Sequence, residues 1–265
     1  MKILTCNIRY FGAADGNNGW KHRRQLCADV IRSRSPDIVC FQEMWAEQYR
    51  DLAAAFPGLQ SYAMVGEPVG RHPTNCIFYR ADGYERVSAG GYWLSDSPHV
   101  TGSKSWESAC VRLANWVRLA ERETGTEFRV INTHLDHVSQ TARENQAKLI
   151  VEDTAAYPTE YPQILTGDMN CDCTNKAIAV FKACGWLDTY AQIHGTEDPG
   201  FTYHEFGGPG YSSECGKMDW IFAKGTVETV DAEIITDSLN GRFPSDHYFV
   251  GAELRIGEQD KRGAS

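Results

Sequence analysis

The sequence predicts a mixed α/β or α+β domain that contains two β-sheets. Short apolar segments of strand length recur along the whole chain, and longer segments with helical periodicity separate several of them. Residues 61–122, by contrast, contain several neighbouring strand segments with no helix between them. With 265 residues, the chain is long enough to bury a substantial core between such elements.

Helical periodicity and helix-ending residues identify the predicted helices. In the segment 20–33, Leu26, Val30 and Ile31 fall on one face of a helix, and Pro36 ends the helix soon afterwards. The next helix is closed by a Pro-Gly pair, and the later helices are recognised by the same periodicity. In chain order, the predicted helices are residues 20–33, 46–56, 140–157 and 176–184.

Runs of apolar residues between these helices predict the strands. The run at 3–8 is typical of a buried strand, and residues 37–41 form a second short apolar run directly after the first helix. A segment rich in glycine and aromatic residues, 201–216, is predicted to be a loop. In chain order, the predicted strands are residues 3–8, 37–41, 75–79, 84–94, 111–120, 128–133, 163–166, 220–223, 226–235 and 248–254.

The composition is that of an ordinary globular protein. Hydrophobic residues make up 42% and charged residues 23% of the chain, which excludes collagen-like, disordered and disulfide-rich miniprotein classes. No stretch approaches the roughly 18 apolar residues of a membrane span, and the first residues lack the pattern of a secretion signal. We therefore expect one domain over 1–256, a C-terminal tail over 257–265, a cytoplasmic location and no membrane partner.

Charge and cysteine content narrow the possible functions. The chain has 26 Lys and Arg against 35 Asp and Glu, a formal net charge of −9. Such a protein is poorly suited to hold long nucleic acids by phosphate neutralisation alone, although a bound metal could still attract one phosphate. The nine cysteines are irregularly spaced and are predicted to be reduced and mostly buried. Cys171 and Cys173 form the only close pair, which leaves a soft-metal site as a minor alternative.

Polar residues at the ends of predicted strands are the main functional signal. Residues two apart in a strand share a face, so Asn132, His134 and Asp136 can point the same way, as can Asp168 and Asn170. If the strand ends converge on one rim, carboxylates, amides and imidazoles gather in one cleft. The candidate residues at these strand ends are Asn7, Glu43, His134, Asp168, Asn170, Asp219, Asp246 and His247.

Such a cluster favours a hard metal cation, although each residue alone has a simpler explanation. Clustered carboxylates need a cation and hydrogen bonds to offset their repulsion, and oxygen ligands suit Mg²⁺ or Mn²⁺ better than structural zinc. Alone, Asp168 beside a glycine is typical of a turn, and Glu43 is typical of a helix N-terminus. A zinc pair of His134 and His137 is disfavoured because the two residues fall on opposite strand faces. A Cys-His hydrolase that uses His247 lacks a nucleophile signature.

Six short segments that contain these residues resemble motifs of the endonuclease/exonuclease/phosphatase superfamily. Its members include pancreatic-type deoxyribonuclease, abasic-site endonucleases, neutral sphingomyelinases, inositol polyphosphate phosphatases and poly(A) deadenylases. The segments occur in the family's order and extend the resemblance from Asn7 to about Leu254. Other segments resemble a bacterial branch of small, deadenylase-like members. The six segments are residues 5–10, 41–43, 131–135, 165–170, 217–222 and 244–248.

The resemblance implies a fold and a chemistry. The implied fold is an α/β (α+β) four-layer sandwich, with two mixed β-sheets packed face to face, helices outside, and the site at one end. The implied activity is metal-dependent phosphoester hydrolysis by in-line attack of water, with Mg²⁺ or Mn²⁺ as the cofactor. Glu43 is the implied principal metal ligand, with Asn7 at or beside the ion. Asp246 is implied to be a second metal contact or a hydrogen-bond partner.

The remaining residues of the cluster take catalytic roles in this scheme. His247 is the implied general base, and Asp219 holds its other ring nitrogen. Asn170 is expected to contact the phosphate or the attacking water. Asp168 is expected to orient Asn170 and the water, or to assist the leaving oxygen. His134 is expected to donate to a phosphate oxygen.

The substrate is less specified by the sequence than the chemistry. No run of Lys and Arg interleaved with aromatic residues predicts a nucleic-acid groove, so a small phosphorylated substrate, monoester or diester, is favoured. The first alternative is a metal-dependent nuclease acting on short single-stranded nucleic acid. A non-catalytic binding module is the second alternative, and the intact catalytic set argues against it. The candidate substrate-binding residues are Arg9, Arg112, Trp20, Trp106, Tyr203 and His204.

Overall fold

Two β-sheets of six strands each form the centre of the structure. The computed structural model describes residues 1–64, 72, 74–212 and 215–257. The strands of the first sheet are β1 (Lys2–Asn7), β2 (Ile38–Gln42), β3 (Leu59–Tyr62), β4 (Ile77–Arg80), β11 (Val227–Ile235) and β12 (Phe249–Ile256). Those of the second sheet are β5 (Tyr84–Trp93), β6 (Leu113–Glu121), β7 (Glu127–His134), β8 (Gln163–Asp168), β9 (Leu187–Asp188) and β10 (Asp219–Lys224). The helices are α1 (Trp20–Ser33), α2 (Ala46–Ala55), α3 (Gln140–Thr154), α4 (Lys176–Ala183), α5 (Thr189–His194), and the short 3₁₀ helices η1 (Gly16–Asn18) and η2 (Gly208–Gly210).

The two sheets share a pairing pattern. The strand order is β11-β12-β1-β2-β4-β3 in the first sheet and β5-β6-β7-β8-β10-β9 in the second. β1 runs parallel to β2, and β7 runs parallel to β8. The other paired strands of both sheets are antiparallel. Both sheets are therefore mixed, as predicted.

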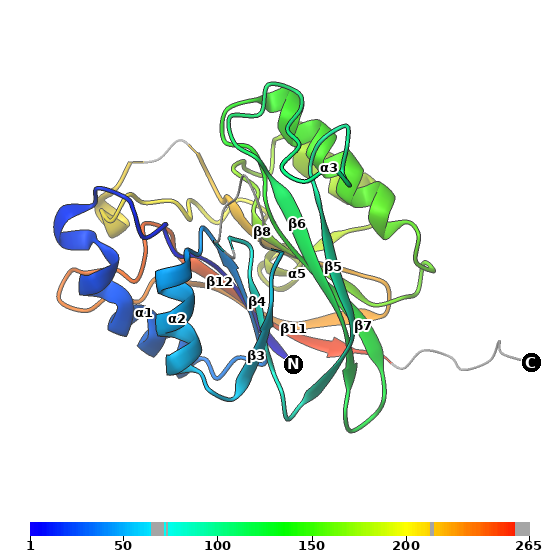
Figure 1. Cartoon of the computed structure of the whole chain (residues 1–265), viewed down its shortest axis with the longest axis horizontal. Coiled ribbons are helices and arrows are strands. Elements are labelled where there is room, and N and C mark those ends of the chain that lie inside the picture. Colours follow the sequence, from blue (N-terminus) through cyan, green and yellow to red (C-terminus); the bar gives the residue numbers. More distant parts are fainter. Residues whose placement is uncertain (65–71, 73, 213–214, 258–265) are drawn as a thin grey trace, which may run out of the picture.

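Helices cover the outer faces of the two sheets (Figure 1). α1 and α2 lie against the first sheet, where Leu4, Ile31 and Leu52 belong to one hydrophobic cluster. α3 and α4 lie against the second sheet, where Ile150 and Ile178 belong to another cluster. The order of layers is therefore helices, sheet, sheet, helices, which confirms the predicted four-layer sandwich.

A third hydrophobic cluster fills the space between the two sheets. Ile77 from the first sheet and Val130 from the second belong to it. Successive side chains of a strand point to opposite faces, so Ile3 faces this space while Leu4 faces the helices. Because the central strands are covered on both faces, they are apolar almost throughout, which is why they could be recognised in the sequence.

The predicted helices and strands are all present, with ends that differ by a few residues, but β3, β9, α5 and the two 3₁₀ helices were not predicted. β3 is a half-buried edge strand with a mixed sequence, and β9 has only two residues, so neither forms an apolar run. α5 has six residues, too few to show helical periodicity. Its start is set locally, because the Asp188 side chain accepts a hydrogen bond from the backbone NH of Tyr190 at 3.1 Å.

All nine cysteines lie in the described part of the chain, and no disulfide joins them there. Burial raises the pKa of the Cys27 thiol to about 12, so this thiol stays protonated. The potential metal-binding group among the described residues contains no cysteine, so nothing supports the soft-metal alternative at Cys171 and Cys173. The buried cysteines, in agreement with the prediction, are Cys6, Cys27, Cys40, Cys76 and Cys171.

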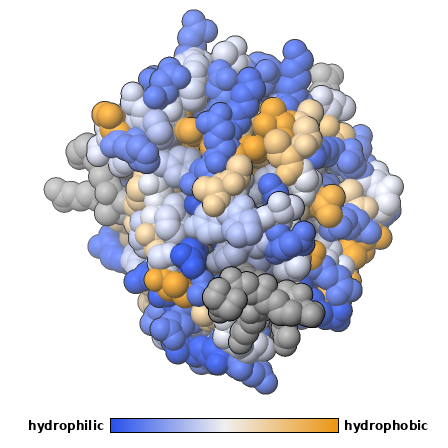
Figure 2. Space-filling model, turned by 90° about the vertical axis from the view of Figure 1, so that its right-hand side faces the viewer, coloured by the Kyte–Doolittle hydropathy of each residue, from blue (hydrophilic) through white to orange (hydrophobic). Residues whose placement is uncertain are grey.

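The surface carries hydrophobic residues in small groups. On the face shown in Figure 2, these groups are separated by hydrophilic residues. Within the described residues, no helix combines the length and the apolar character needed to cross a bilayer. Gly257, the first residue of the predicted tail, donates its backbone NH to the Thr226 carbonyl at 2.8 Å. Residues 258–265 of that tail lie outside the described residues.

A buried asparagine joins the two sheets through polar contacts. Asn132 of β7 is fully buried, and its Nδ2 donates to the carbonyls of Phe41 at 2.8 Å and Cys76 at 3.2 Å. Its Oδ1 accepts a hydrogen bond of 2.6 Å from Gln42 Nε2. Asn132 therefore satisfies backbone and side-chain groups of the first sheet that no water reaches.

Replacing Asn132 with leucine should lower the free energy of unfolding by about 3 kcal/mol, because it removes three buried hydrogen bonds worth roughly 1 kcal/mol each. Urea unfolding with an unchanged m-value would measure this loss. Ile164→Val, which removes one methylene from the same inter-sheet core, is the matched control and should cost about 1 kcal/mol. An Asn132→Leu variant as stable as the control would contradict this account.

Candidate active site

Strand pairing brings the polar strand ends to one end of the sandwich. In the parallel pair β1 and β2, Asn7 lies opposite Gln42, and in the parallel pair β7 and β8, His134 lies opposite Asp168. β10 is antiparallel to β8 and begins where β8 ends, so Asp219 also lies opposite Asp168. The segment before β12 reaches the same end, because β12 is antiparallel to β1. Residues far apart in the sequence therefore meet at one edge.

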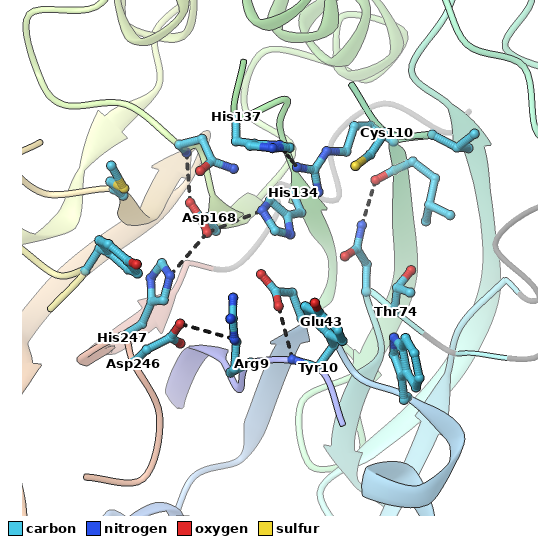
Figure 3. Close-up of a pocket in the computed structure, with 18 of the residues that line it drawn as sticks. Arg9, Tyr10, Glu43, Thr74, Cys110, His134, His137, Asp168, Asp246 and His247 are labelled. Carbon is cyan, nitrogen blue, oxygen red and sulfur yellow. Dashed lines mark hydrogen bonds and ion pairs between the residues drawn. The ribbon is translucent and has the colours of Figure 1, made fainter. Parts of the chain in front are cut away.

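A cavity of about 630 Å³ opens at this end (Figure 3). Asn7 and Asp219 lie behind its wall, and each contacts a residue that lines it. The predicted catalytic and metal-binding residues that line the cavity are Glu43, His134, Asp168, Asn170, Asp246 and His247.

Asp168 is the hydrogen-bonding centre of the site. Its Oδ2 accepts from Asn7 Nδ2 at 2.9 Å and lies 3.4 Å from His134 Nε2 and 3.8 Å from His247 Nε2. Its Oδ1 accepts from the backbone NH of Asn170 at 2.8 Å. Burial, together with the negative charge of Asp219, raises the pKa of Asp168 to about 7. A nearby positive charge would therefore stabilise the ionised form of this carboxyl group.

Gly167 allows Asp168 to sit beside β7. Its φ is +151°, and a Cβ atom at this position would lie 2.2 Å from the carbonyl oxygen of Thr133. The two strands therefore approach closely only because residue 167 has no side chain. Asp168 is the last residue of β8 and not a turn residue, which excludes the simpler explanation of the Gly-Asp pair.

Asp219 determines the orientation and the charge of His247. Its Oδ2 lies 2.9 Å from His247 Nδ1, which places the proton on Nδ1 and leaves Nε2 directed toward Asp168. Burial opposes a charge on the imidazole, but Asp219, Asp168 and Asp246 together outweigh burial and raise the pKa of His247 to about 10. These carboxylates therefore favour the imidazolium form.

His134 is in the opposite electrostatic situation. It is buried, and burial together with the positive charge of Arg112 holds its pKa well below the usual value. His134 is therefore neutral at physiological pH and can donate one hydrogen bond without adding charge. Two histidines of one cavity thus have distinct protonation states, which is the usual sign of distinct roles.

The oxygen atoms around the cavity fit a hard divalent cation. Glu43 Oε2 accepts from the backbone NH of Tyr10 at 3.1 Å, and the carboxylates of Asp168 and Asp246 line the same cavity. Burial, then the charge of Glu43, raises the pKa of Asp246, so this group also gains from a bound cation. This set of carboxylates with no thiolate is typical of Mg²⁺ or Mn²⁺.

A second group that could hold a metal lies deeper. Ligand atoms of Asp168, Asp219 and His247 lie within 4.8 Å of one another, and all three residues are buried. Asp219 Oδ2 is already engaged by the imidazole of His247. Asp219 is therefore engaged with His247, and the carboxylates that line the cavity are more accessible to a cation.

Asn7, which was expected at or beside the metal ion, contacts two carboxylates of the site. Asn7 directs its amide nitrogen, not its oxygen, at Glu43 Oε1 (3.2 Å) and Asp168 Oδ2 (2.9 Å). Its oxygen accepts from the backbone NH of Arg9 at 3.0 Å. An amide nitrogen does not bind hard cations. In this arrangement Asn7 is a hydrogen-bond donor that holds two carboxylates together.

Three residues that line the cavity have left-handed backbone conformations. The φ values are +51° at Arg9, +61° at Glu43 and +50° at Asn170, and each residue follows the end of a strand. Such conformations cost energy in residues with a side chain and are concentrated at functional sites. Asn170 is held by two contacts, from its backbone NH to Asp168 and from its Nδ2 to the Leu135 carbonyl at 2.9 Å.

The predicted substrate-binding residues divide into two groups. Arg9, Arg112 and Tyr203 line the cavity, whereas the other three do not. Trp20 belongs to the core under α1, and its Nε1 donates to Asp51 Oδ2 at 2.8 Å.

His204 and Trp106 are the other two predicted substrate-binding residues that do not line the cavity. His204 is fully buried between Phe243 and Tyr248, and its Nδ1 accepts from the backbone NH of Gly208. Trp106 lies in the loop between β5 and β6 but does not itself line the cavity, and its carbonyl accepts a hydrogen bond from Ser139 Oγ. In all three residues, packing or loop contacts replace the expected contact with substrate.

The expectation that Asn132, His134 and Asp136 share a direction holds only in part. Asn132 faces the first sheet, inward of His134. Asp136 lies beyond the end of β7 and is buried in a loop, where it accepts hydrogen bonds from Ser108 and from four backbone NH groups. His137 was expected on the opposite strand face from His134, but both line the cavity, because β7 ends at His134 and strand alternation no longer applies.

Sequence reasoning missed other residues that line the cavity. Tyr10 and Trp45 follow predicted strand-end residues closely and could have been found by extending the search along the loops. Thr74 and Asn75 lie just before β4, the strand that follows β2 in the order of the first sheet. Nothing in the sequence indicates that this segment reaches the cavity.

Several solved structures share this architecture, among them two from Bacteroides species. An endonuclease/exonuclease/phosphatase from Bacteroides vulgatus is 29% identical, with a TM-score of 0.87 over 97% of this chain and 98% of that chain. A mannosyl-6-phosphatase from Bacteroides thetaiotaomicron is 28% identical, with a TM-score of 0.86 over 97% of this chain and all of that chain (100%).

Sequence comparison extends the similarity to animals and to the family as a whole. Nocturnin from Drosophila melanogaster is 27% identical over 221 residues, which cover 73% of this chain and 33% of Nocturnin. This chain thus spans about a third of the length of that relative. The family described as Endonuclease/Exonuclease/phosphatase matches residues 4–247, almost the whole chain. On this match, and on the fold and cavity described above, the chain belongs to the endonuclease/exonuclease/phosphatase family.

Proposed function

We propose that this protein is a metal-dependent hydrolase of small phosphoesters, in which water attacks the phosphorus in line. The observation that carries the proposal is the contact between Asp219 and His247 at 2.9 Å, directed at a cavity that also contains Glu43, Asp168 and Asp246. An oriented imidazole and a set of oxygen ligands in one cavity are the parts that such a reaction needs.

Glu43 would be the principal metal ligand, with Asp246 and Asp168 as the further carboxylates on the cavity. A bound Mg²⁺ or Mn²⁺ would offset the charge of the phosphate and, by its own charge, lower the pKa of His247 so that the imidazole is neutral before attack. Asn7 would keep Glu43 and Asp168 in place through its amide group.

His247 would take the proton of the attacking water on Nε2. Asp219 holds Nδ1 and stabilises the imidazolium that forms, which is the effect behind the raised pKa of His247. His134, held neutral, would donate to a phosphate oxygen as negative charge accumulates there. Asp168 would orient Asn170 through the hydrogen bond to its backbone NH, and Asn170 would contact the phosphate or the water.

The volume of the cavity and the net charge of the protein support a small substrate. A cavity of about 630 Å³ lies within the range that is usual for small-molecule sites. The net charge of −9 disfavours extended contact with a polyanion. The mannosyl-6-phosphatase, 28% identical over nearly the whole chain, makes sugar phosphates the first class to test.

Hydrolysis of p-nitrophenyl phosphate should disappear after dialysis against EDTA and return with Mg²⁺ or Mn²⁺. Glu43→Gln should move the metal titration to higher concentrations, because it removes the charge of the principal ligand. Glu228→Gln, at an exposed position of β11, is the matched control and should leave the titration unchanged. Full activity in EDTA would exclude the metal mechanism. A wild-type protein that cleaves only oligonucleotides, with steep salt dependence, would favour the nuclease alternative.

His247→Ala should lower kcat on the order of 10³-fold, because proton transfer and water positioning are lost together. Asp219→Asn should lower kcat less, because the imidazole remains although its orientation weakens. Steady-state kinetics at saturating metal, with circular dichroism to confirm folding, would measure both effects. His22→Ala, on the exposed surface of α1, is the control. Our assignment of the two roles is wrong if a folded Asp219→Asn variant is the slower enzyme.

A further inference from the structure

Two arginines line the cavity, and they differ in how their charge is compensated. Arg9 lies 3.2 Å from Asp15 through Nη2 and 3.6 Å from Asp246 through Nε, so two carboxylates compensate it before a substrate binds. Arg112 forms no ion pair with a carboxylate among the residues that the structure describes. Its Nη2 lies 3.2 Å from His137 Nδ1, and its Nε is buried without a hydrogen-bond partner. Arg112 therefore keeps its positive charge for a ligand.

The contact with Arg112 also fixes the hydrogen bonding of His137. A guanidinium group can only donate, so His137 Nδ1 accepts and the ring proton is on Nε2. His134 lines the same cavity and can also donate from its ring. We call these three residues, Arg112, His134 and His137, the donor wall. Each contributes N–H groups, and none contributes negative charge.

The donor wall lies across the cavity from Asp246, although His134 Nε2 also lies 3.4 Å from the carboxylate of Asp168. Figure 3 shows His134 and His137 on one side of the cavity, and Arg9 and Asp246 on the other. A phosphate between the two sides meets carboxylates on one side and N–H donors on the other. The wall can therefore bind terminal oxygens that point away from the metal ligands.

We propose that the donor wall makes this enzyme selective for phosphate monoesters over diesters. A monoester has three terminal oxygens and a charge between −1.5 and −2 at pH 7, whereas a diester has two terminal oxygens and about one charge. The additional oxygen and charge require an uncompensated cation with several donors, and a planar guanidinium is the side chain best suited to this. The inference rests on the proposed hydrolase function and names its substrate class.

The test uses two substrates with the same leaving group, p-nitrophenyl phosphate and methyl p-nitrophenyl phosphate, at saturating Mn²⁺. The wild type should favour the monoester. Arg112→Met should lower the ratio of kcat/KM for monoester over diester by at least about tenfold, because it removes hydrogen bonds to a charged group that only the monoester makes fully. Arg9→Met is the matched control. Because Arg9 is already compensated, its loss should change both values of kcat/KM by a similar factor.

Equal losses on both substrates in Arg112→Met would overturn the inference, as would a wild type that cleaves the diester faster. A wild type that cleaves neither ester in any divalent metal would contradict the proposed function itself. The two failures are therefore distinguishable.

A different observation concerns Arg23 of α1, which is fully buried and bonded only to backbone carbonyls. Its Nη1 donates to Ile8 and to Pro244, both at 2.8 Å. Its Nη2 donates to Arg9 at 3.0 Å, and its Nε donates to Asn18 at 2.8 Å. Within the described residues it forms no ion pair with a carboxylate, so this arginine serves to hold the chain and not to balance charge.

The carbonyls that Arg23 binds belong to the two loops that carry the site. The pairing of β1 with β12 ends at Thr5, and beyond it the two segments separate. One segment continues to Asn7 and Arg9, and the other carries Asp246 and His247. Arg23 lies between these segments and joins them where the β-ladder no longer does.

We infer that Arg23 is a positioning residue, which sets the spacing between Asn7 on one loop and Asp246 and His247 on the other. Arg23 also holds the left-handed conformation of Arg9, because its Nη2 donates to the Arg9 carbonyl. Gln48 Nε2 donates to the same carbonyl at 2.7 Å. Errors of about 1 Å in such spacing cost large factors in rate. This inference, like the first, rests on the proposed function.

Arg23→Lys tests the role, because lysine keeps the charge but cannot reach four carbonyls at once. The matched control is Arg129→Lys on β7. Arg129 is equally buried, lies between the rings of Trp116 and Tyr157, and bonds to Asp153 at 2.7 Å, but it does not line the cavity. Both variants should melt at lower temperature, and only Arg23→Lys should lose kcat, on the order of tenfold, below its melting transition.

The Mn²⁺ concentration for half-maximal activity should rise in Arg23→Lys and not in Arg129→Lys, because only the first variant disturbs the ligand loops. If folded Arg23→Lys keeps kcat and metal response within twofold of the wild type, or if Arg129→Lys loses as much kcat, Arg23 has a purely structural role and the inference is wrong.

Discussion

The parallel pairing of β1 with β2 and of β7 with β8 is the constraint on which the rest of the structure depends. It brings the ends of two strands from each sheet to one edge, so that Asn7 and the Glu43 loop meet His134 and Asp168. The space between the sheets is then apolar core over most of its length and a polar cavity at its end. The transition between them occurs at Asn132, whose amide group satisfies buried groups of the first sheet just inward of the cavity. The fold thus excludes water from one side of the site, and electrostatic interactions there are strengthened accordingly.

The cavity brings several carboxylates close together, and the protein engages most of them with its own donors and cations. Asn7 donates to two carboxylates, Asp219 is paired with His247, and Arg9 shares its charge between Asp15 and Asp246. The pKa values of Asp168 and Asp246 nevertheless remain raised, chiefly because both groups are buried and have carboxylate neighbours. Remaining negative charge of this kind is what a divalent cation would neutralise, and the same charge makes the imidazole of His247 a strong proton acceptor. One electrostatic property therefore supports both the metal site and the general base that we propose.

The sequence predicted most of the fold because the central strands and the long helices are apolar in regular patterns. It could not predict β3, β9 or α5, which are too short or too polar to show a pattern. The strand-end residues were predictable because alternation along a strand is a fixed geometric rule. Where that rule stops, prediction failed: His137 lies three residues beyond β7 and lines the cavity, and Asp136 is buried in a loop. Aromatic residues were the least predictable, since Trp20 and His204 are chemically suited to substrate contact but are held in the core by packing.

The three arginines near the site show why residue type alone does not specify a role. Arg9, Arg23 and Arg112 carry the same charge, and the sequence offers no basis for ranking them. Their partners separate them: two carboxylates compensate Arg9, backbone carbonyls enclose Arg23, and an imidazole leaves Arg112 uncompensated. A guanidinium bound to carbonyls stabilises chain geometry, one bound to carboxylates is electrostatically satisfied, and one bound to a neutral ring still attracts an anion. The charge available to a substrate is therefore set by what each arginine already binds, and in this cavity that criterion selects Arg112.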